Sequence, residues 1–187
     1  MDYLNEFQSN PERGAALLVS EYGDRLFEVA KRICLNTYDA EDLVFRTFAQ
    51  AIRKIETFRR KSSFYTWLYA IMMNFYRMDL RLKSANALLF QAELPEIEDT
   101  ALDPGEVLAK EVDAELLRMI VSRLPERLRE VVIFRYFEDL SMSEIAKILD
   151  IPVGTVRFRL FTARNEIRRR LMQTKTDGEA SKGMERF

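Results

Sequence analysis

Apolar residues recur at intervals of three and four along most of the chain, a spacing that predicts helices. Three such segments follow one another in the N-terminal half, at 14–32, 39–56 and 64–82, whereas residues 1–13 show no clear period and are expected to be a loose lead-in. The third segment has the most regular stripe, which we expect to be buried: Phe64, Leu68, Ile71, Phe75, Met78 and Leu82. Helical spacing resumes near Val112 and again after Pro125. The sequence therefore predicts an all-α fold.

A stretch without periodicity, residues 84–109, separates the two groups of helices. It contains six acidic residues and no basic residue, together with Pro95, Pro104 and Gly105. This composition indicates a flexible linker. We therefore expect two small helical domains, a bundle at 1–84 and a second domain at 112–172, joined by an acidic linker at 85–111. The polar tail at 173–187 contains two glycines and is expected to be disordered.

The most specific pattern lies near the C-terminus. Ser141 followed by Glu144 fits a capping box, which predicts that a helix begins near Met142. The pattern is interrupted at 150–152, and Pro152 suits the first turn of a new helix because its missing N–H costs nothing there. The new helix has a buried stripe at Val156, Leu160, Ala163, Ile167 and Leu171. Two short helices joined by a tight turn are typical of a helix-turn-helix motif.

The second helix of this motif has a polar and basic outer surface. Residues 153–170 contain six arginines and one acidic residue, Glu166, in a chain whose net charge is −1. At about 100° per residue, Phe158, Thr162, Asn165 and Arg169 point away from the buried stripe, and the flanks carry Arg157, Arg159, Arg164 and Arg168. This arrangement is typical of a recognition helix in the DNA major groove. The alternative is an amphipathic surface helix whose arginines are merely solvated.

A second basic segment, residues 53–83, contains eight basic and two acidic residues and is rich in aromatic residues. Tyr65, Tyr69 and Tyr76 fall on one flank of the expected Phe64 stripe, and the other flank carries Trp67, Asn74, Arg77 and Arg81. Aromatic faces beside cations can hold unpaired bases. The alternative is that Trp67 and the tyrosines lie half-buried at the rim of the bundle.

Other classes of protein lose support from residues that are missing or scarce. The chain of 187 residues has no histidine, so the usual metal ligand and general base are absent, which argues against most hydrolytic enzymes and zinc sites. Its single cysteine, Cys34, excludes an internal disulfide. There is no run of about 18 apolar residues and no signal-peptide pattern, so we expect a soluble cytoplasmic protein.

Taken in order, these features resemble the extracytoplasmic-function (group IV) sigma factors, small two-domain initiation factors of bacterial RNA polymerase. The segment DAEDLVFRTFAQA at 39–51 is similar to the region that grips the clamp helices of the polymerase largest subunit. The segment FRRKSSFYTWLYAIMMN at 58–74 is similar to the region that melts and reads the minus-10 element. Residues 124–164 are similar to the region that reads the minus-35 element. The resemblance covers nearly all of residues 14–171.

The resemblance implies that the chain has no catalytic residue, metal, cofactor or small-molecule substrate. Its implied partners are core RNA polymerase, promoter DNA as duplex and as non-template single strand, and an anti-sigma factor. The implied polymerase-binding residues are Asp39, Glu41, Asp42, Leu43, Phe45, Arg46 and Phe48. The implied minus-10 residues are Arg59, Arg60, Lys61, Ser62, Ser63, Phe64, Tyr65, Trp67, Asn74 and Arg77. The implied minus-35 residues are Thr155, Arg157, Phe158, Arg159, Thr162 and Asn165.

The chain departs from the family pattern at two places. The family commonly has a glutamine and an acid at the positions of Phe45 and Arg46, and a small or basic residue and an arginine at those of Phe158 and Thr162. Phe158 could touch a thymine methyl group, so the usual promoter sequence is not assumed.

Two other functions remain open from the residues alone. One is a helix-turn-helix regulator that binds duplex DNA without polymerase, normally as a symmetric dimer. The other is an enzyme acting on nucleic acid, with Asp39, Glu41 and Asp42 as metal ligands. An N-cap at Asp39, with the other two acids in the first turn, explains these carboxylates better.

Overall fold

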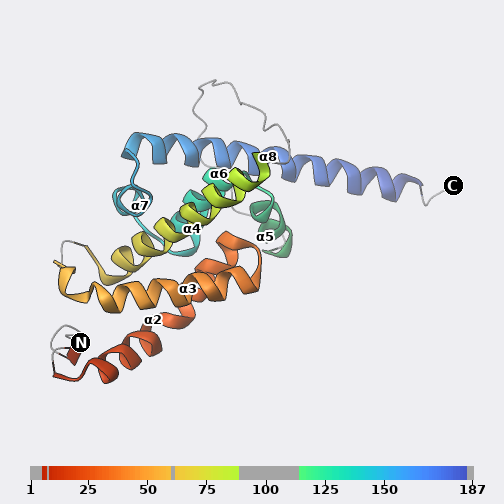
Figure 1. Cartoon of the computed structure of the whole chain (residues 1–187). Helices are drawn as coiled ribbons and strands as arrows, with labels where there is room; N and C mark the ends of the chain where they lie inside the picture. The colour runs from red at the N-terminus through yellow and green to blue at the C-terminus, as the bar shows by residue number, and fades with distance from the viewer. Residues whose placement is uncertain (1–5, 8, 60–61, 89–113, 185–187) are drawn as a thin grey trace. The chain divides into compact units, whose positions relative to one another are not determined.

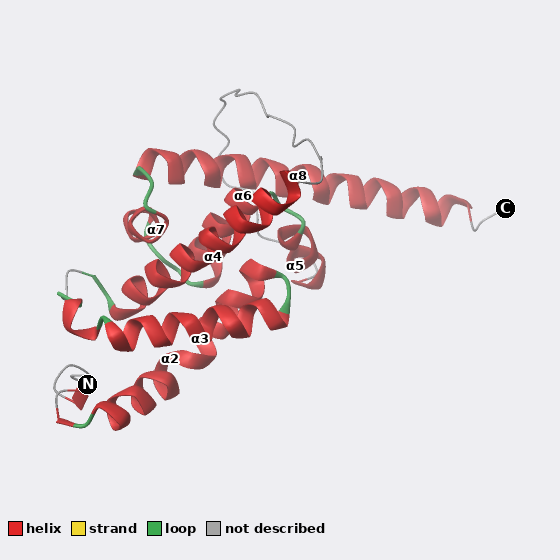
Figure 2. Ribbon diagram, in the orientation of Figure 1, coloured by secondary structure: helices red, strands yellow, loops and turns green. Residues whose placement is uncertain are grey.

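The computed structural model describes residues 6–7, 9–59, 62–88 and 114–184, and side chains within these ranges up to 85 and up to 174. Within those ranges every regular element is a helix, as the sequence predicted (Figure 2). The elements are α2 (Pro11–Cys34), α3 (Thr37–Arg53), η1 (Ile55–Thr57), α4 (Phe64–Leu88), α5 (Ala114–Ser122), α6 (Glu126–Val132), η2 (Ile133–Phe137), α7 (Met142–Leu149) and α8 (Val153–Met184).

Two compact units are distinguished, one containing α2, α3, α4 and α7 and the other α5, α6, η2 and α8. The expected domain bounds, with α7 in the C-terminal domain, remain a prediction. In the first unit α3 packs against both α2 and α4 (Figure 1). Its core is formed by fully buried apolar side chains: Leu18, Leu26, Ile33, Leu43, Leu68, Met72 and Met73.

The first helix begins earlier than the sequence predicted. Asn10 caps α2 by accepting a hydrogen bond from the backbone N–H of Arg13, and Pro11 takes the first helical position. Phe7 is buried against Gly14, where a Cβ would lie 2.9 Å from the ring of Phe7. The loose lead-in expected for residues 1–13 is therefore wrong for the described part of that range.

The next two helices, α3 and α4, are also capped by side chains at their N-termini. Asn36 caps α3 by accepting from the N–H of Tyr38 at 2.9 Å, so Asp39 lies inside the helix rather than at its cap. Ser63 caps α4, with its Oγ accepting from the N–H of Thr66 at 3.1 Å. The prediction placed the cap at Asp39, although Asn36 precedes it and asparagine is among the preferred N-cap residues.

The buried face of α4 is rotated from the predicted stripe. Leu68, Tyr69, Met72 and Met73 are fully buried and Tyr76 nearly so, whereas Met78 and Leu82 of the predicted stripe are 46% and 58% exposed. The helix carries apolar residues on several sides, so two rows satisfy the same spacing and the period alone cannot choose between them.

The second unit is held together by an apolar cluster between α5, α6 and α8. The cluster consists of Ile120, Val121, Leu124, Val132, Ala163, Ile167 and Leu171. The stripe predicted for α8 is buried along its whole length, from Val156 to Leu171. The predicted boundaries of the helix-turn-helix also hold, because α7 begins at Met142 and α8 at Val153. Asp150 in the turn adopts a left-handed φ of 49°.

The predicted linker and tail fall only partly within the described residues. Helix α4 continues to Leu88, into the first residues of the expected linker, and 89–113 lie outside the described part of the chain. Helix α8 continues to Met184, so the predicted disorder is contradicted over 173–184. Extending an existing helix avoids the free-energy cost of nucleation. This advantage outweighs the loss of helix stability caused by the two glycines of the tail.

Candidate functional site

The outer face of α8 carries most of the predicted minus-35 residues. Arg157 and Phe158 are exposed, and Thr155, Thr162 and Asn165 are half-buried. The Thr162 hydroxyl donates to the carbonyl of Phe158 at 3.1 Å on its own helix. The outer face is therefore available to a ligand at five of the six predicted positions.

Arg159 is the exception among these six residues. Its Nη1 lies 4.0 Å from Oε2 of Glu130 on α6, and its side chain is only 17% exposed. Glu130 is itself buried, and an unpaired charge there would be costly. Arg159 therefore ties α8 to α6 in this structure rather than facing outward with Phe158.

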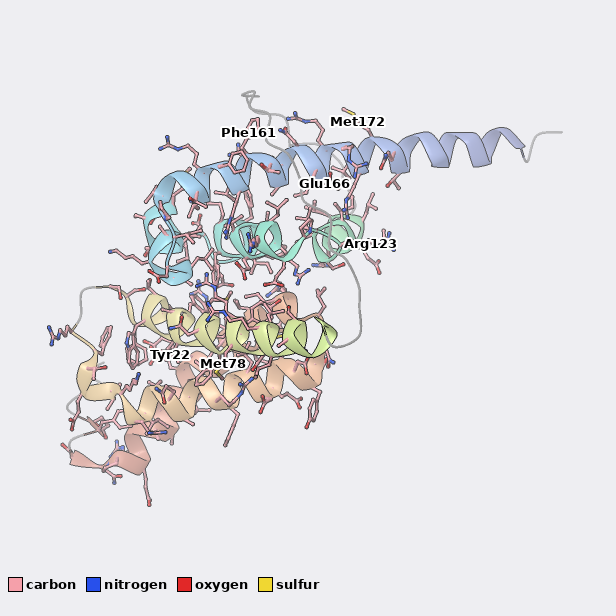
Figure 3. All side chains as sticks on the ribbon, turned by 45° about the horizontal axis from the view of Figure 1, so that its top comes forward. Tyr22, Met78, Arg123, Phe161, Glu166 and Met172 are labelled. Atoms are coloured by element: carbon pink, nitrogen blue, oxygen red, sulfur yellow. The ribbon has the colours of Figure 1, made fainter. Side chains whose placement is uncertain are left out.

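Sequence reasoning did not include Phe161 in this face. Phe161 of α8 (Figure 3) is half-buried. It follows Arg157 by four residues and Phe158 by three, so it shares their side of the helix. The helical spacing of the sequence could therefore have predicted that Phe161 belongs to this face.

Glu166 on α8 holds two further arginines. Its carboxylate accepts hydrogen bonds from Arg169 at 2.9 and 2.7 Å and from Arg170 at 2.6 Å (Figure 3). Hydrogen bonds from Arg169 lower the pKa of Glu166 to about 2, with further help from Arg170. Arg170 also donates to the carbonyl of Arg123 at 2.9 Å, in the turn after α5. This cluster fixes the side of α8 that faces α5.

The predicted minus-10 segment is built on an aromatic cluster. The rings of Phe58, Phe64 and Trp67 lie with their centroids 5.0 to 5.3 Å apart. Tyr22 of α2 extends the cluster, 5.0 Å from Phe64 and 4.6 Å from Tyr65. Trp67 is half-buried at the edge of this cluster, so one part of its ring packs and the rest faces solvent. Both interpretations of Trp67, rim packing and base stacking, are compatible with that position.

The other predicted minus-10 residues differ in accessibility. Phe64 is buried, and Tyr65 lies under the guanidinium of Arg25, whose Cζ is 4.3 Å from the ring centroid. Arg59, Ser63 and Asn74 are exposed, and Ser62 and Arg77 are half-buried. Arg60 and Lys61 lie outside the described residues. Tyr69 and Tyr76, expected on a flank, are buried in the bundle.

The motif at 39–51 divides between two sides of α3. On the α4 side, Arg46 donates to Asp79 at 3.0 and 2.5 Å, and its Nε lies 2.8 Å from Asp42. Lys83 of α4 donates to Asp39 at 2.8 Å. These hydrogen bonds raise the pKa of both cations, Arg46 through Asp79 and Lys83 through Asp39.

These ion pairs also bear on the enzyme hypothesis. Two of its three proposed ligands, Asp39 and Asp42, already face cationic side chains. Where the structure describes side chains, no group of three or more His, Cys, Asp or Glu residues could hold a metal ion. Asp39 therefore joins α3 to α4 through Lys83, and Asp42 pairs with Arg46 on its own helix.

On its other side, α3 forms an apolar groove with α2. The groove has a volume of about 620 Å³ and is lined by Val19, Gly23, Phe27, Glu41, Val44, Phe45, Phe48, Ala49 and Ile52. Phe45 is 73% exposed at this groove, which is unusual for a large apolar side chain. Leu43 and Phe48 of the same motif are buried. Sequence reasoning missed the contribution of α2, although Val19, Gly23 and Phe27 recur every four residues beside its core stripe.

Comparisons with known proteins agree with this architecture. The family model of sigma-70 region 2 matches residues 18–85, and that of sigma-70 region 4 matches residues 114–167.

No described helix of the chain meets the length and hydropathy needed to span a bilayer.

Relatives of known identity align over nearly the whole chain. The ECF RNA polymerase sigma-E factor of Haemophilus influenzae is 34% identical over 184 residues, covering 90% of this chain and 93% of that protein. The sigma-E factor of Escherichia coli K12 is 35% identical over 181 residues (88% and 90%), and SigW of Bacillus subtilis is 27% identical over 179 residues (90% and 94%).

Two solved structures share the fold. The sigma factor RpoE of Bartonella quintana, in complex with the anti-sigma factor NepR, gives a TM-score of 0.66 at 23% identity, covering 84% of this chain and 96% of that one. CnrH in complex with the cytosolic domain of CnrY gives 0.62 at 21% identity, covering 91% and 96%. Because the family models match more than half of the chain and relatives above 30% identity align along most of it, the chain belongs to the ECF RNA polymerase sigma factors.

Proposed function

We propose that this sigma factor uses three separate surfaces to bind core polymerase, the minus-10 strand and the minus-35 duplex. The chain itself performs no catalysis and works in the cytoplasm, where it selects promoters for core RNA polymerase. The observation that carries the proposal is the solvent-facing side of α8, where Phe158 is exposed opposite a fully buried stripe and Arg157 is exposed on its flank. That face has the size and charge of a helix that enters the DNA major groove.

The minus-35 duplex is read by the outer face of α8. Arg157 has a planar guanidinium that can bond a guanine edge or a phosphate in pairs of hydrogen bonds. Phe158 supplies an apolar surface that suits a thymine methyl group. Thr155, Phe161, Thr162 and Asn165 complete the face, and Arg159 acts instead as a positioning residue through Glu130.

The minus-10 strand is captured beside Trp67 and the loop that precedes α4. A base must leave the duplex stack to be read, at a cost of a few kcal/mol, so an aromatic partner is needed to offset that cost. The half-buried indole of Trp67, held by Phe58 and Phe64, can supply such a partner. Arg59 and Asn74 are exposed on the same segment and would hold the strand.

Core polymerase is bound at the apolar groove between α2 and α3, with Phe45 and Glu41 as the accessible residues of the predicted motif. An anti-sigma factor is also a proposed partner. RpoE, which shares the fold, was solved in complex with the anti-sigma factor NepR, and CnrH was solved in complex with the cytosolic domain of CnrY.

The test combines the purified chain with core RNA polymerase and genomic DNA, followed by sequencing of the transcript starts. We expect a new set of start sites that share two promoter elements. Arg157→Ala should weaken promoter binding and reduce the dependence of log affinity on log salt by about 0.9 if it contacts one phosphate. Unchanged promoter affinity and salt slope would contradict the assigned face. Tight binding to an operator without polymerase would favour a stand-alone regulator.

A further inference from the structure

The arginines of α8 differ in whether a carboxylate neutralises them. On a helix that turns about 100° per residue, Arg157, Arg164 and Arg168 project from one flank of the buried stripe. Arg159 and Arg170 project from the opposite flank, where Glu166 lies beside them, and Arg169 reaches Glu166 from the outer face. The two flanks therefore have different sets of charged neighbours.

The flank of Arg159 and Arg170 is largely neutralised. Glu130 faces Arg159, and Glu166 binds both Arg169 and Arg170. Three arginines and two carboxylates leave a net charge of +1 on this side. The two carboxylates would also repel a phosphate strand laid along it.

The other flank keeps its full positive charge. Arg157 is exposed and Arg168 half-buried, and neither has a hydrogen-bond or ion-pair partner among the described residues. The Nε of Arg164 donates to the carbonyl of Leu160 at 3.4 Å, a weak bond to its own helix that leaves the other guanidinium N–H groups. Among the side chains that the structure describes, no carboxylate pairs with these three arginines, so their net charge is +3. From 157 to 168 the helix rises about 16 Å, which spans several nucleotides of a DNA strand.

We infer that Arg157, Arg164 and Arg168, here called the arginine row, lie along one phosphate strand of the minus-35 duplex. Arg168 thereby extends the contact to about three and a half turns beyond Thr155, the first residue of the base-reading face. The duplex is then held asymmetrically, because the opposite flank contributes positioning contacts inside the protein and none to phosphate. The inference rests on the proposed minus-35 function of α8 and adds which side of the helix the backbone follows.

Adjacent arginines on α8 provide a matched experiment. The holoenzyme, formed from core RNA polymerase and the full chain, is titrated onto a double-stranded promoter fragment selected by the wild type, at several salt concentrations. Arg168→Gln should lower the slope of log affinity against log salt by about 0.9 and weaken matched and mutated minus-35 sequences by the same factor. Arg169→Gln, which removes a charge already paired with Glu166, should leave the slope unchanged. Arg168→Lys, which keeps the charge, should retain the wild-type slope.

Three outcomes would overturn the inference. Equal effects of Arg168→Gln and Arg169→Gln would mean that pairing does not select the phosphate-binding side. No effect of Arg168→Gln would remove it from the interface, provided that circular dichroism shows both variants folded. If the wild-type chain formed a holoenzyme that ignored the minus-35 sequence, the proposed function of α8 would fail first, and the inference with it.

Discussion

The guanidinium of Arg46 on α3 donates two hydrogen bonds to the carboxylate of Asp79 on α4, and the Nε of Arg46 lies 2.8 Å from Asp42. Both partners of the Arg46–Asp79 pair are less than one-third exposed, so the pair is shielded from solvent more than a typical surface ion pair. This geometry accounts for the departure at Arg46, where the family commonly has an acid. In this chain the position joins two helices, and an acid there would lie beside Asp42 and Asp79.

We expect Arg46→Gln to destabilise the N-terminal bundle by about 1–3 kcal/mol, because it leaves Asp79 without its charged donor. Urea unfolding of Arg46→Gln, Asp79→Asn and the double variant would measure the coupling between the two residues. Lys83→Gln is the matched control, since Lys83 is 67% exposed and its pair with Asp39 should contribute little. Additive effects in the cycle would show that the two side chains do not stabilise each other.

Phe45 should be an anchor for core polymerase. We expect Phe45→Gln to weaken holoenzyme formation by roughly tenfold to a hundredfold, because a large aromatic side chain would lose its buried contact. Tyr38→Gln is the control, since Tyr38 is 78% exposed on the same helix and does not line the groove. A fluorescence titration of labelled chain with core polymerase would compare the two. If both variants bound as the wild type does, the groove would not be the polymerase site.

Trp67→Ala should impair promoter opening more than polymerase binding. Stacking on an aromatic ring contributes about 1–3 kcal/mol per base, so the stability of the open complex should fall by roughly 5-fold to 150-fold. Trp67→Phe keeps an aromatic face beside Phe58 and Phe64 and should retain most of the opening. Permanganate footprints of the non-template strand measure this step, and identical footprints for Trp67→Ala and the wild type would remove Trp67 from the site.

Glu166 should make the C-terminal unit sensitive to acid. Its pKa falls from an ordinary 4.5 to about 2 in the folded chain, so it contributes stability above pH 4.5 that is lost as the pH falls toward 2. The contribution is at most about 3 kcal/mol, and smaller in so far as solvent screens the cluster. Urea unfolding at pH 6 and pH 3 should show a stability difference between the wild type and Glu166→Gln that shrinks on acidification. A difference independent of pH would mean that the carboxylate charge is not what stabilises the cluster.

The sequence predicted some elements much better than others, for a physical reason. Helix α8 has one apolar stripe between polar faces, so its buried side follows directly from the period. Helix α4 is apolar on several sides, and its orientation depends on packing against α3, which no local pattern encodes. The same limit applies to α2, whose second apolar row lines the groove with Phe45.

The partners of charged side chains were the least predictable part of the candidate site. Residues 157 and 159 are both arginines on the flanks of one helix, yet only Arg159 meets a buried carboxylate, supplied by Glu130 from another helix. Contacts between segments distant in the chain decide such pairings. The outer positions of α8 could therefore be predicted as a set, whereas the role of each arginine required the structure.

The open surroundings of Gly154 give the molecule a natural attachment point for a probe. A Cβ added there would meet no atom of the described protein within 4 Å, and the glycine has no positive φ to forbid a side chain. Since Cys34 is the single thiol of the chain, a Cys34→Ser, Gly154→Cys variant would carry one maleimide dye or photo-crosslinker at the first turn of α8. Such a label could report the arrival of the duplex in real time while leaving the helix packing as it is.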